Sequence, residues 1–127
     1  MATERIIILA IVIASLISVA SAVAGTATYY TEYLPSACYG NQGQGTMIAA
    51  ANRGLYSNGA ACGKYYKVRC TGPTNEGVPQ PCRNGEITVK IVDLCPGCGT
   101  NQLDLSQQAF SKIANPDAGR IHIEYNP

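Results

Sequence analysis

The side chains best suited to chemistry in this 127-residue chain are six cysteines, one histidine and a few carboxylates. The cysteines stand at positions 38, 62, 70, 82, 95 and 98, and an even number in so short a chain predicts three disulfides. Cys95 and Cys98 also form a C-x-x-C motif, which would suit a thioredoxin-like redox site or half of a zinc site. A second half with zinc-ligand spacing is missing, and the motif does not open a helix in a βαβ unit. Disulfides are the favoured interpretation, and neither a metal nor a cofactor is predicted.

One carboxylate stands out by its position on a predicted strand. Residues 86–94 alternate apolar and polar side chains after an Asn-Gly turn, which is typical of a half-buried strand. Asp93 has the parity of the apolar residues, so we expect it to point with them and to need a partner or a cleft. A structural aspartate at a strand end gives the same pattern. His122, beside Glu124 in a final predicted strand, is expected to face solvent.

These residues are positioned by short strands and a single helix. Strands are expected over residues 25–31, 46–51, 64–70, 86–94 and 119–125. Residues 34–45 and 71–81 are predicted loops, and 53–63 an irregular turn region. Ser106 is a good N-cap for one helix, which has an apolar stripe and ends at Asn115-Pro116. The pattern predicts a mainly β fold with one short helix, closed rather than sandwiched.

The N-terminus has the form of a secretory signal peptide. An apolar run covers residues 6–20, follows Arg5, and leads to the small-residue sites Ala20-x-Ala22 and Ala22-x-Ala24. We predict a leader over residues 1–24, with cleavage after Ala24 or Ala22. An uncleaved membrane anchor is the alternative, because residues 6–24 nearly reach the ~20 needed to span a bilayer. No second apolar run follows, so we expect an exported mature chain without a membrane span, in a space that permits disulfides.

Composition excludes several classes of protein. The formal net charge is +1, from nine basic and eight acidic residues, which argues against a nucleic-acid partner. Hydrophobic residues make up 46% of the chain, which argues against disorder. One domain, expected to be monomeric, fits the length.

Three segments carry a resemblance to a known family. They are GTATYY at residues 25–30, CGKYYKVRC at 62–70, and VDLCP at 92–96 leading to LDLSQQAF at 103–110. They recur in this order in expansin-type domains, and IANPDAG at 113–119 narrows the match. The chain resembles the plant natriuretic peptides and the blight-associated, barwin-related endoglucanase-like domain proteins. The resemblance implies a disulfide-stabilised, six-stranded double-psi β-barrel over residues 25–127, with pairs Cys38–Cys62, Cys70–Cys82 and Cys95–Cys98.

The resemblance also bears on catalysis. Family-45 endoglucanases share this barrel and use two aspartates, and inversion needs a carboxylate on each side of the bond. The position of their acid matches Asp104, whereas Thr28 and its neighbours offer no carboxylate for the base. The resemblance therefore implies a protein that is not an enzyme, with Asp93 and Asp104 as vestigial groove acids. A weak polysaccharide groove would comprise Thr28, Tyr29, Asp93 and Asp104. Asp104 is equally explained as a structural residue just before a helix.

Single-domain members of this family resemble secreted signalling proteins. The resemblance implies a non-enzymatic signalling or stress protein of the apoplast, acting on a cell-surface receptor in water, ion and solute homeostasis. Its recognition segment would be residues 33–64, in which Tyr39, Arg53 and Tyr56 are expected to be exposed. The same segment is alternatively only a disulfide-tied connection of the barrel. The alternative function is an expansin-like or defence-related protein that binds wall polysaccharide without hydrolysing it.

Overall fold

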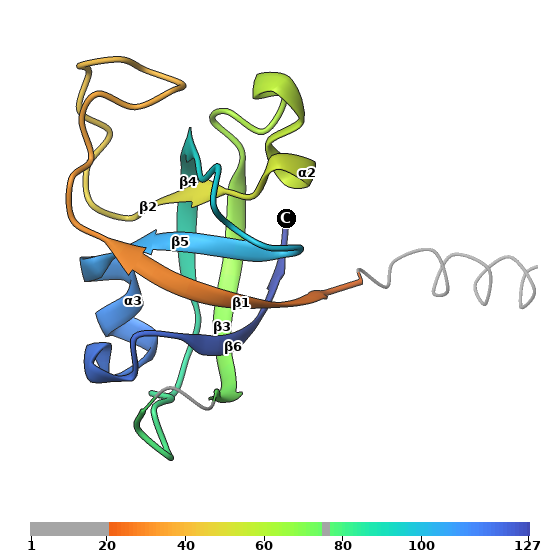
Figure 1. Cartoon of the computed structure of the whole chain (residues 1–127), viewed down its shortest axis with the longest axis vertical. Coiled ribbons are helices and arrows are strands. Elements are labelled where there is room, and N and C mark those ends of the chain that lie inside the picture. Colours follow the sequence, from red (N-terminus) through yellow and green to blue (C-terminus); the bar gives the residue numbers. More distant parts are fainter. Residues whose placement is uncertain (1–20, 75–76) are drawn as a thin grey trace, which may run out of the picture.

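The computed structural model describes residues 21–74 and 77–127, so residues 1–20 of the predicted leader (1–24) lie outside the described part. Six strands close into a barrel (Figure 1). They are β1 (Val23–Tyr30), β2 (Ile48–Ala51), β3 (Tyr65–Pro73), β4 (Ile87–Leu94), β5 (Gln102–Ser106) and β6 (Ile121–Asn126). The mainly β barrel implied by the resemblance is confirmed. Across the described residues, no helix has the length and apolar composition needed to cross a membrane.

Strands far apart in the sequence become neighbours in the barrel. The order around the ring is β1-β5-β2-β4-β3-β6, with β1–β5 and β2–β4 paired in parallel. The other neighbours, β1–β6, β2–β5, β3–β4 and β3–β6, are antiparallel. This closure leaves no unpaired sheet edge. It also brings the end of β4 and the middle of β5 to the two sides of β2.

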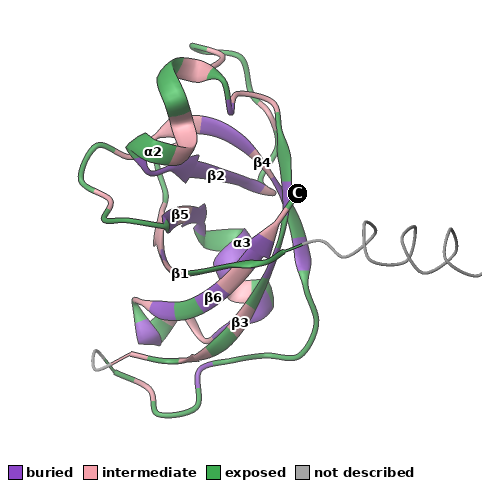
Figure 2. Cartoon of the chain, turned by 90° about the vertical axis from the view of Figure 1, so that its right-hand side faces the viewer, coloured by how far each residue is buried: buried purple, intermediate pink, exposed green. Residues whose placement is uncertain are grey.

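The core fills the barrel from strands that alternate as the sequence predicts. Tyr66 and Val68 of β3 are buried, and the neighbouring positions 65 and 67 are exposed. In Figure 2, buried residues (purple) recur along the strands and on α3. Helix α3 (Gln107–Ile113) contributes Phe110 to this core, and the Ser106 Oγ caps the helix by accepting from the Ala109 N–H at 3.0 Å. The predicted helix and its cap are confirmed.

All three disulfides form with the pairing that the resemblance implies. Cys38–Cys62 ties the long loop after β1 to the segment before β3, and Cys70–Cys82 ties β3 to the loop before β4. Cys95–Cys98 closes the turn between β4 and β5. A domain of this size buries a small core, so such cross-links are a common source of its stability.

Two expectations about elements need correction. The region expected to be an irregular turn contains a second helix, α2 (Arg53–Tyr56), followed by a 3-10 turn η1 (Ser57–Gly59). The cause is Asn52, whose side chain accepts from the Leu55 N–H at 3.1 Å and so caps the helix. Strand β3 also runs on to Pro73, beyond the predicted end at residue 70, because it keeps pairing with β6 past a register shift.

Asp93 does not point with the core residues of β4. The pairing between β2 and β4 shifts register, so Ala49 faces Ile91 whereas Ala50 faces Asp93. Val92 is the extra residue of this β-bulge, and a bulge breaks the alternation on which the parity argument rests. Ala49 belongs to the core cluster and Ala50 does not, so Asp93 lies on the outer side of the barrel.

Candidate functional site

Four residues line up across adjacent strands on the outer face of the barrel. Thr28 of β1 pairs with Asp104 of β5, Asp104 pairs with Ala50 of β2, and Ala50 pairs with Asp93 of β4. We call this set the acid row. The two aspartates stand two strand spacings apart, about 10 Å between backbones, with only a methyl side chain between them. The fold thus brings together three of the four predicted groove residues.

A chain of three hydrogen bonds leads from the Cys95–Cys98 turn to Asp104. The Gly99 N–H donates to Gln102 Oε1 at 2.9 Å, and Gln102 Nε2 donates to Thr28 Oγ1 at 3.1 Å. Thr28 Oγ1 in turn donates to Asp104 Oδ1 at 2.9 Å. Because a backbone N–H can only donate, it fixes the orientation of the Gln102 amide. Thr28 therefore gives its own proton to the Asp104 carboxylate.

The surroundings of Asp104 hold the pKa of its carboxyl group above the ordinary value. Burial raises the pKa of Asp104, the Thr28 hydrogen bond opposes this rise, and the charge of Asp93 adds to it. The hydrogen bond acts in that direction because it stabilises the charged form. Protonation would change this group from an acceptor into a donor of a hydrogen bond to a ligand hydroxyl.

Asp93 serves the structure of the site. Its Oδ1 accepts from the N–H groups of Ala37 and Leu94, both at 2.9 Å. The first bond holds the loop between β1 and β2 against the end of β4. These backbone groups are the partner that a carboxylate at this strand end needs.

Tyr29 does not lie on the outer face with the acid row, whereas Tyr30 does, two residues after Thr28 on β1. The Tyr29 ring packs on the core, 4.9 Å from the ring of Phe110, because it shares its face with Ala27. Tyr30 has the parity of Thr28, and its buried hydroxyl has no hydrogen-bond partner. Burial raises the pKa of Tyr30, and the charges of Asp93 and Asp104 raise it further. The alternation of side chains along β1 places Tyr30 on the same face as Thr28, so the sequence could have predicted it. The GTATYY motif instead singled out Tyr29.

The predicted recognition segment is less exposed than expected. Arg53 is exposed at the start of α2, as predicted. Tyr39 is half-buried beneath Lys90, whose Nζ lies 4.7 Å from the ring centroid, and Tyr56 is half-buried against the core. Packing against the barrel leaves only part of each ring accessible to a partner. His122 is exposed on β6 and pairs with Thr26 of β1, not with a residue of the acid row.

The arrangement favours binding over acid–base catalysis. Hydrolysis with inversion needs a second free carboxylate opposite the acid. Within the described residues, β1 supplies Thr28 rather than a carboxylate, and an oxygen of Asp93 is occupied by two backbone N–H groups. No group of three His, Cys, Asp or Glu side chains in residues 21–74 and 77–127 is placed to hold a metal ion.

Comparisons with known proteins agree on one family. A family model described as lytic transglycolase matches residues 48–125. The chain is 54% identical to an EG45-like domain containing protein of Citrus jambhiri, over 98% of this chain and 95% of that protein. It is 46% identical to the putative EG45-like domain containing protein 1 of Arabidopsis thaliana, over 98% of this chain and 99% of that one.

Solved structures agree with these relatives. An apo expansin of Clavibacter michiganensis superposes with a TM-score of 0.67 at 29% identity, covering 84% of this chain and 50% of that chain. A variant of the same expansin in complex with cellohexaose gives a TM-score of 0.66 at 28% identity, with the same coverage.

Proposed function

This chain belongs to the EG45-like family of expansin-related proteins, and on that premise we propose that it binds wall polysaccharide along the acid row without cleaving it. The observation that carries the proposal is the acid row itself. One titratable carboxyl and one hydroxyl, Asp104 and Thr28, lie on the outer face, and their mutual bond is fixed by Gln102. Groups of this kind exchange hydrogen bonds with sugar hydroxyls. The cellohexaose complex of a related expansin supports a glucan as the ligand.

We propose that the bound glycan is not hydrolysed. The description of the matching family model names a glycan-cleaving activity, which makes cleavage the competing hypothesis. The support for binding alone is the tethered oxygen of Asp93 and the hydroxyl, not a carboxylate, at Thr28. Release of new chain ends from soluble glucan, lost on Asp104→Asn, would contradict this part of the proposal.

We also propose that the protein is secreted to the apoplast as a monomer. The three disulfides support an oxidising compartment. Val23 and Ala24 pair with Tyr125 and Glu124, so cleavage of the leader after Ala22 would leave β1 whole. Cleavage after Ala24 would remove two paired residues. Mass spectrometry of the secreted chain distinguishes the two sites.

A pull-down on insoluble cellulose and xylan tests the polysaccharide proposal. The oxidised mature protein should bind at least one of them, and Asp104→Ala should release it. Asp117→Ala is the matched control, because Asp117 is an exposed aspartate in the turn after α3, away from the acid row. Equal retention of the Asp104→Ala and Asp117→Ala variants, both folded, would overturn the proposal.

A second function, extracellular signalling like that of the plant natriuretic peptides, is favoured by the segment over residues 33–64. Arg53 is exposed there at the start of α2, and the Cys38–Cys62 disulfide holds the segment to the barrel. We propose that Arg53 contacts a cell-surface receptor. In a cell-swelling assay, Arg53→Ala should abolish the response while glucan binding persists. A response that follows Asp104 and ignores Arg53 would contradict the signalling proposal.

A further inference from the structure

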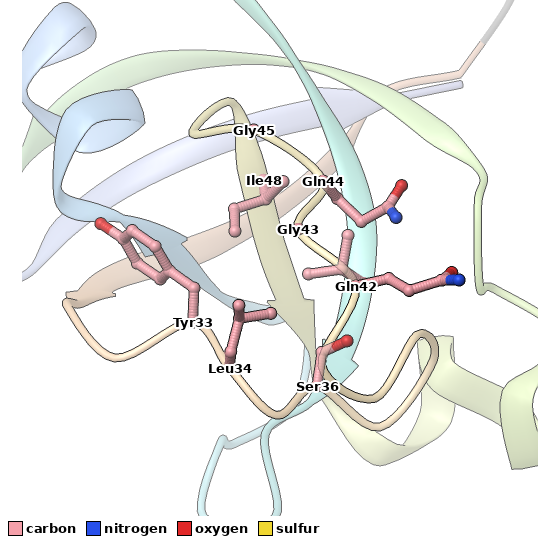
Figure 3. A pocket seen from close by; sticks show the side chains of 9 residues that line it. Tyr33, Leu34, Ser36, Gln42, Gly43, Gln44, Gly45 and Ile48 are labelled. Carbon is pink, nitrogen blue, oxygen red and sulfur yellow. The ribbon is translucent and has the colours of Figure 1, made fainter.

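A pocket of about 330 Å³ opens on the outer face of the barrel, under the loop between β1 and β2 (Figure 3). Its floor is formed by Ile48 of β2 and Val92 of β4, both buried. Tyr33 and Leu34 stand on one side of it, and the glutamine-bearing part of the same loop stands on the other. None of the residues that line the pocket carries a charge. We call it the Leu34 pocket.

The Leu34 pocket adjoins the acid row. Ile48 precedes Ala50 by two residues on the same face of β2, and Val92 immediately precedes Asp93 on β4. At about 3.3 Å per residue along a strand, the floor of the pocket lies roughly 7 Å from the row. A glycan lying along the acid row would therefore pass the mouth of the pocket.

The polar side chains around the pocket are engaged elsewhere or point away from it. Ser36 Oγ accepts from the Tyr39 N–H at 3.1 Å, and in Figure 3 the Gln42 amide points away from Leu34. The Tyr33 hydroxyl donates to Gln108 and accepts from the Gln107 N–H at 3.3 Å. Gln44 Oε1 accepts from Lys90 Nζ at 2.6 Å, and in Figure 3 its amide points away from Leu34. The floor offers only aliphatic carbon. A sugar ring on this aliphatic floor would lose water from its hydroxyls and find few hydrogen-bond partners in exchange, which disfavours it.

An uncharged aromatic ring meets none of these penalties. A closed apolar cavity of roughly 150 Å³ already holds benzene, so this volume accommodates a ring with its linker. The wall includes the ring of Tyr33, which packs edge-on against Tyr30 with centroids 5.2 Å apart and is therefore held in place. Aromatic pairs gain from such offset or edge-on contact.

We propose that the Leu34 pocket takes an uncharged aromatic substituent carried by the polysaccharide on the acid row. The preferred ligand class is then an aryl-substituted glucan rather than a bare chain. This inference rests on the polysaccharide-binding function proposed above, and it adds a second contact of different chemistry. The acid row supplies hydrogen bonds, and the pocket selects chains that carry the ring.

Calorimetry with three probes tests the inference: benzyl β-cellotrioside, cellotriose and benzyl alcohol. The wild-type protein should bind the benzyl glycoside about tenfold more tightly than cellotriose, equivalent to about 1.4 kcal/mol. Leu34→Ala should abolish this preference and leave the affinity for cellotriose unchanged. Tyr65→Ala is the matched control, because Tyr65 is 58% exposed on β3 and lies outside the pocket, whereas Leu34 is 49% exposed.

Equal affinity for the two glycosides, or a preference that survives Leu34→Ala, overturns the inference. If neither glycoside binds, the polysaccharide proposal is wrong. The titration with benzyl alcohol then tests whether the Leu34 pocket binds an aromatic ring. Shifts of the Leu34, Ile48 and Val92 methyl signals on adding benzyl alcohol would then support an aromatic site. Unchanged methyl signals would overturn it.

Discussion

Replacing Thr28 by valine removes the one hydrogen bond that opposes the burial of Asp104. The Thr28 hydroxyl accepts from Gln102 Nε2 and donates to Asp104 Oδ1 at 2.9 Å. Valine keeps the branched shape and loses both bonds. The bond to Asp104 favours the carboxylate, so its loss should raise the pKa of Asp104 further.

The size of this shift follows from the type of bond. A hydrogen bond to a charged group contributes about 1.5–3 kcal/mol. Asp104 is only half-buried, so water replaces part of the lost interaction and the low end applies. About 1.4 kcal/mol corresponds to one pKa unit. We expect Thr28→Val to raise the pKa of Asp104 by roughly one unit.

A carbon-detected NMR titration of the Asp104 carboxyl measures the shift directly. Urea unfolding gives an independent check, because the lost bond favours the charged form. Thr28→Val should therefore destabilise the protein by about 1.4 kcal/mol more at pH 7 than at pH 3. Thr26→Val is the control, since Thr26 has the same parity on β1 and pairs with Gln102 rather than Asp104. An unchanged or lowered pKa of Asp104 in Thr28→Val would refute the hydrogen-bond chain.

Three further perturbations test other parts of the structure. Tyr30→Phe removes a buried hydroxyl without a partner, so it should raise the free energy of unfolding in urea by about 1 kcal/mol; a loss of stability would contradict this. Because folding raises the pKa of Asp104, the contribution of this carboxyl to the stability of the wild type should fall as the pH rises from about 4 through the folded pKa. Thermal melts of Asp104→Asn should show a smaller decline with pH, and an equal decline would contradict this. Ser106→Ala removes the cap of α3 and should cost about 1 kcal/mol, or about 4–8 °C in Tm, and a melting curve like that of the wild type would argue against the cap.

The sequence predicts most of the fold because its signals are local. Alternating burial places Tyr66 and Val68 correctly, and the cap at Ser106 marks the helix. The closed six-stranded barrel and the disulfide pairing came from the family resemblance, since six cysteines allow fifteen pairings and no local rule selects among them. Asn52 carried the signal for α2, but four residues give too short a pattern for the periodicity to be seen.

The site was harder to predict because it depends on pairing between strands. The orientation of Asp93 depends on the bulge at Val92, which exists only through the register of β4 against β2. The chain from Gly99 through Gln102 to Thr28 joins residues up to 74 positions apart. Likewise, the Leu34 pocket forms only when the loop after β1 folds over β2 and β4. The spacing of these residues in the sequence does not predict such contacts.

The central claim, that the acid row binds a glucan, is tested most directly by mapping soluble cellohexaose onto the protein by NMR. The account predicts that backbone signals of Thr28, Ala50 and Asp104 shift together with increasing ligand and saturate with a single affinity. Signals on β3 and on the exposed side of β6 should stay in place, because these strands close the ring opposite β5 and β2, and their pairing with β4 and β1 ends before Asp93 and Thr28. Saturable shifts confined to α2 around Arg53, or no shifts at all, would contradict the claim.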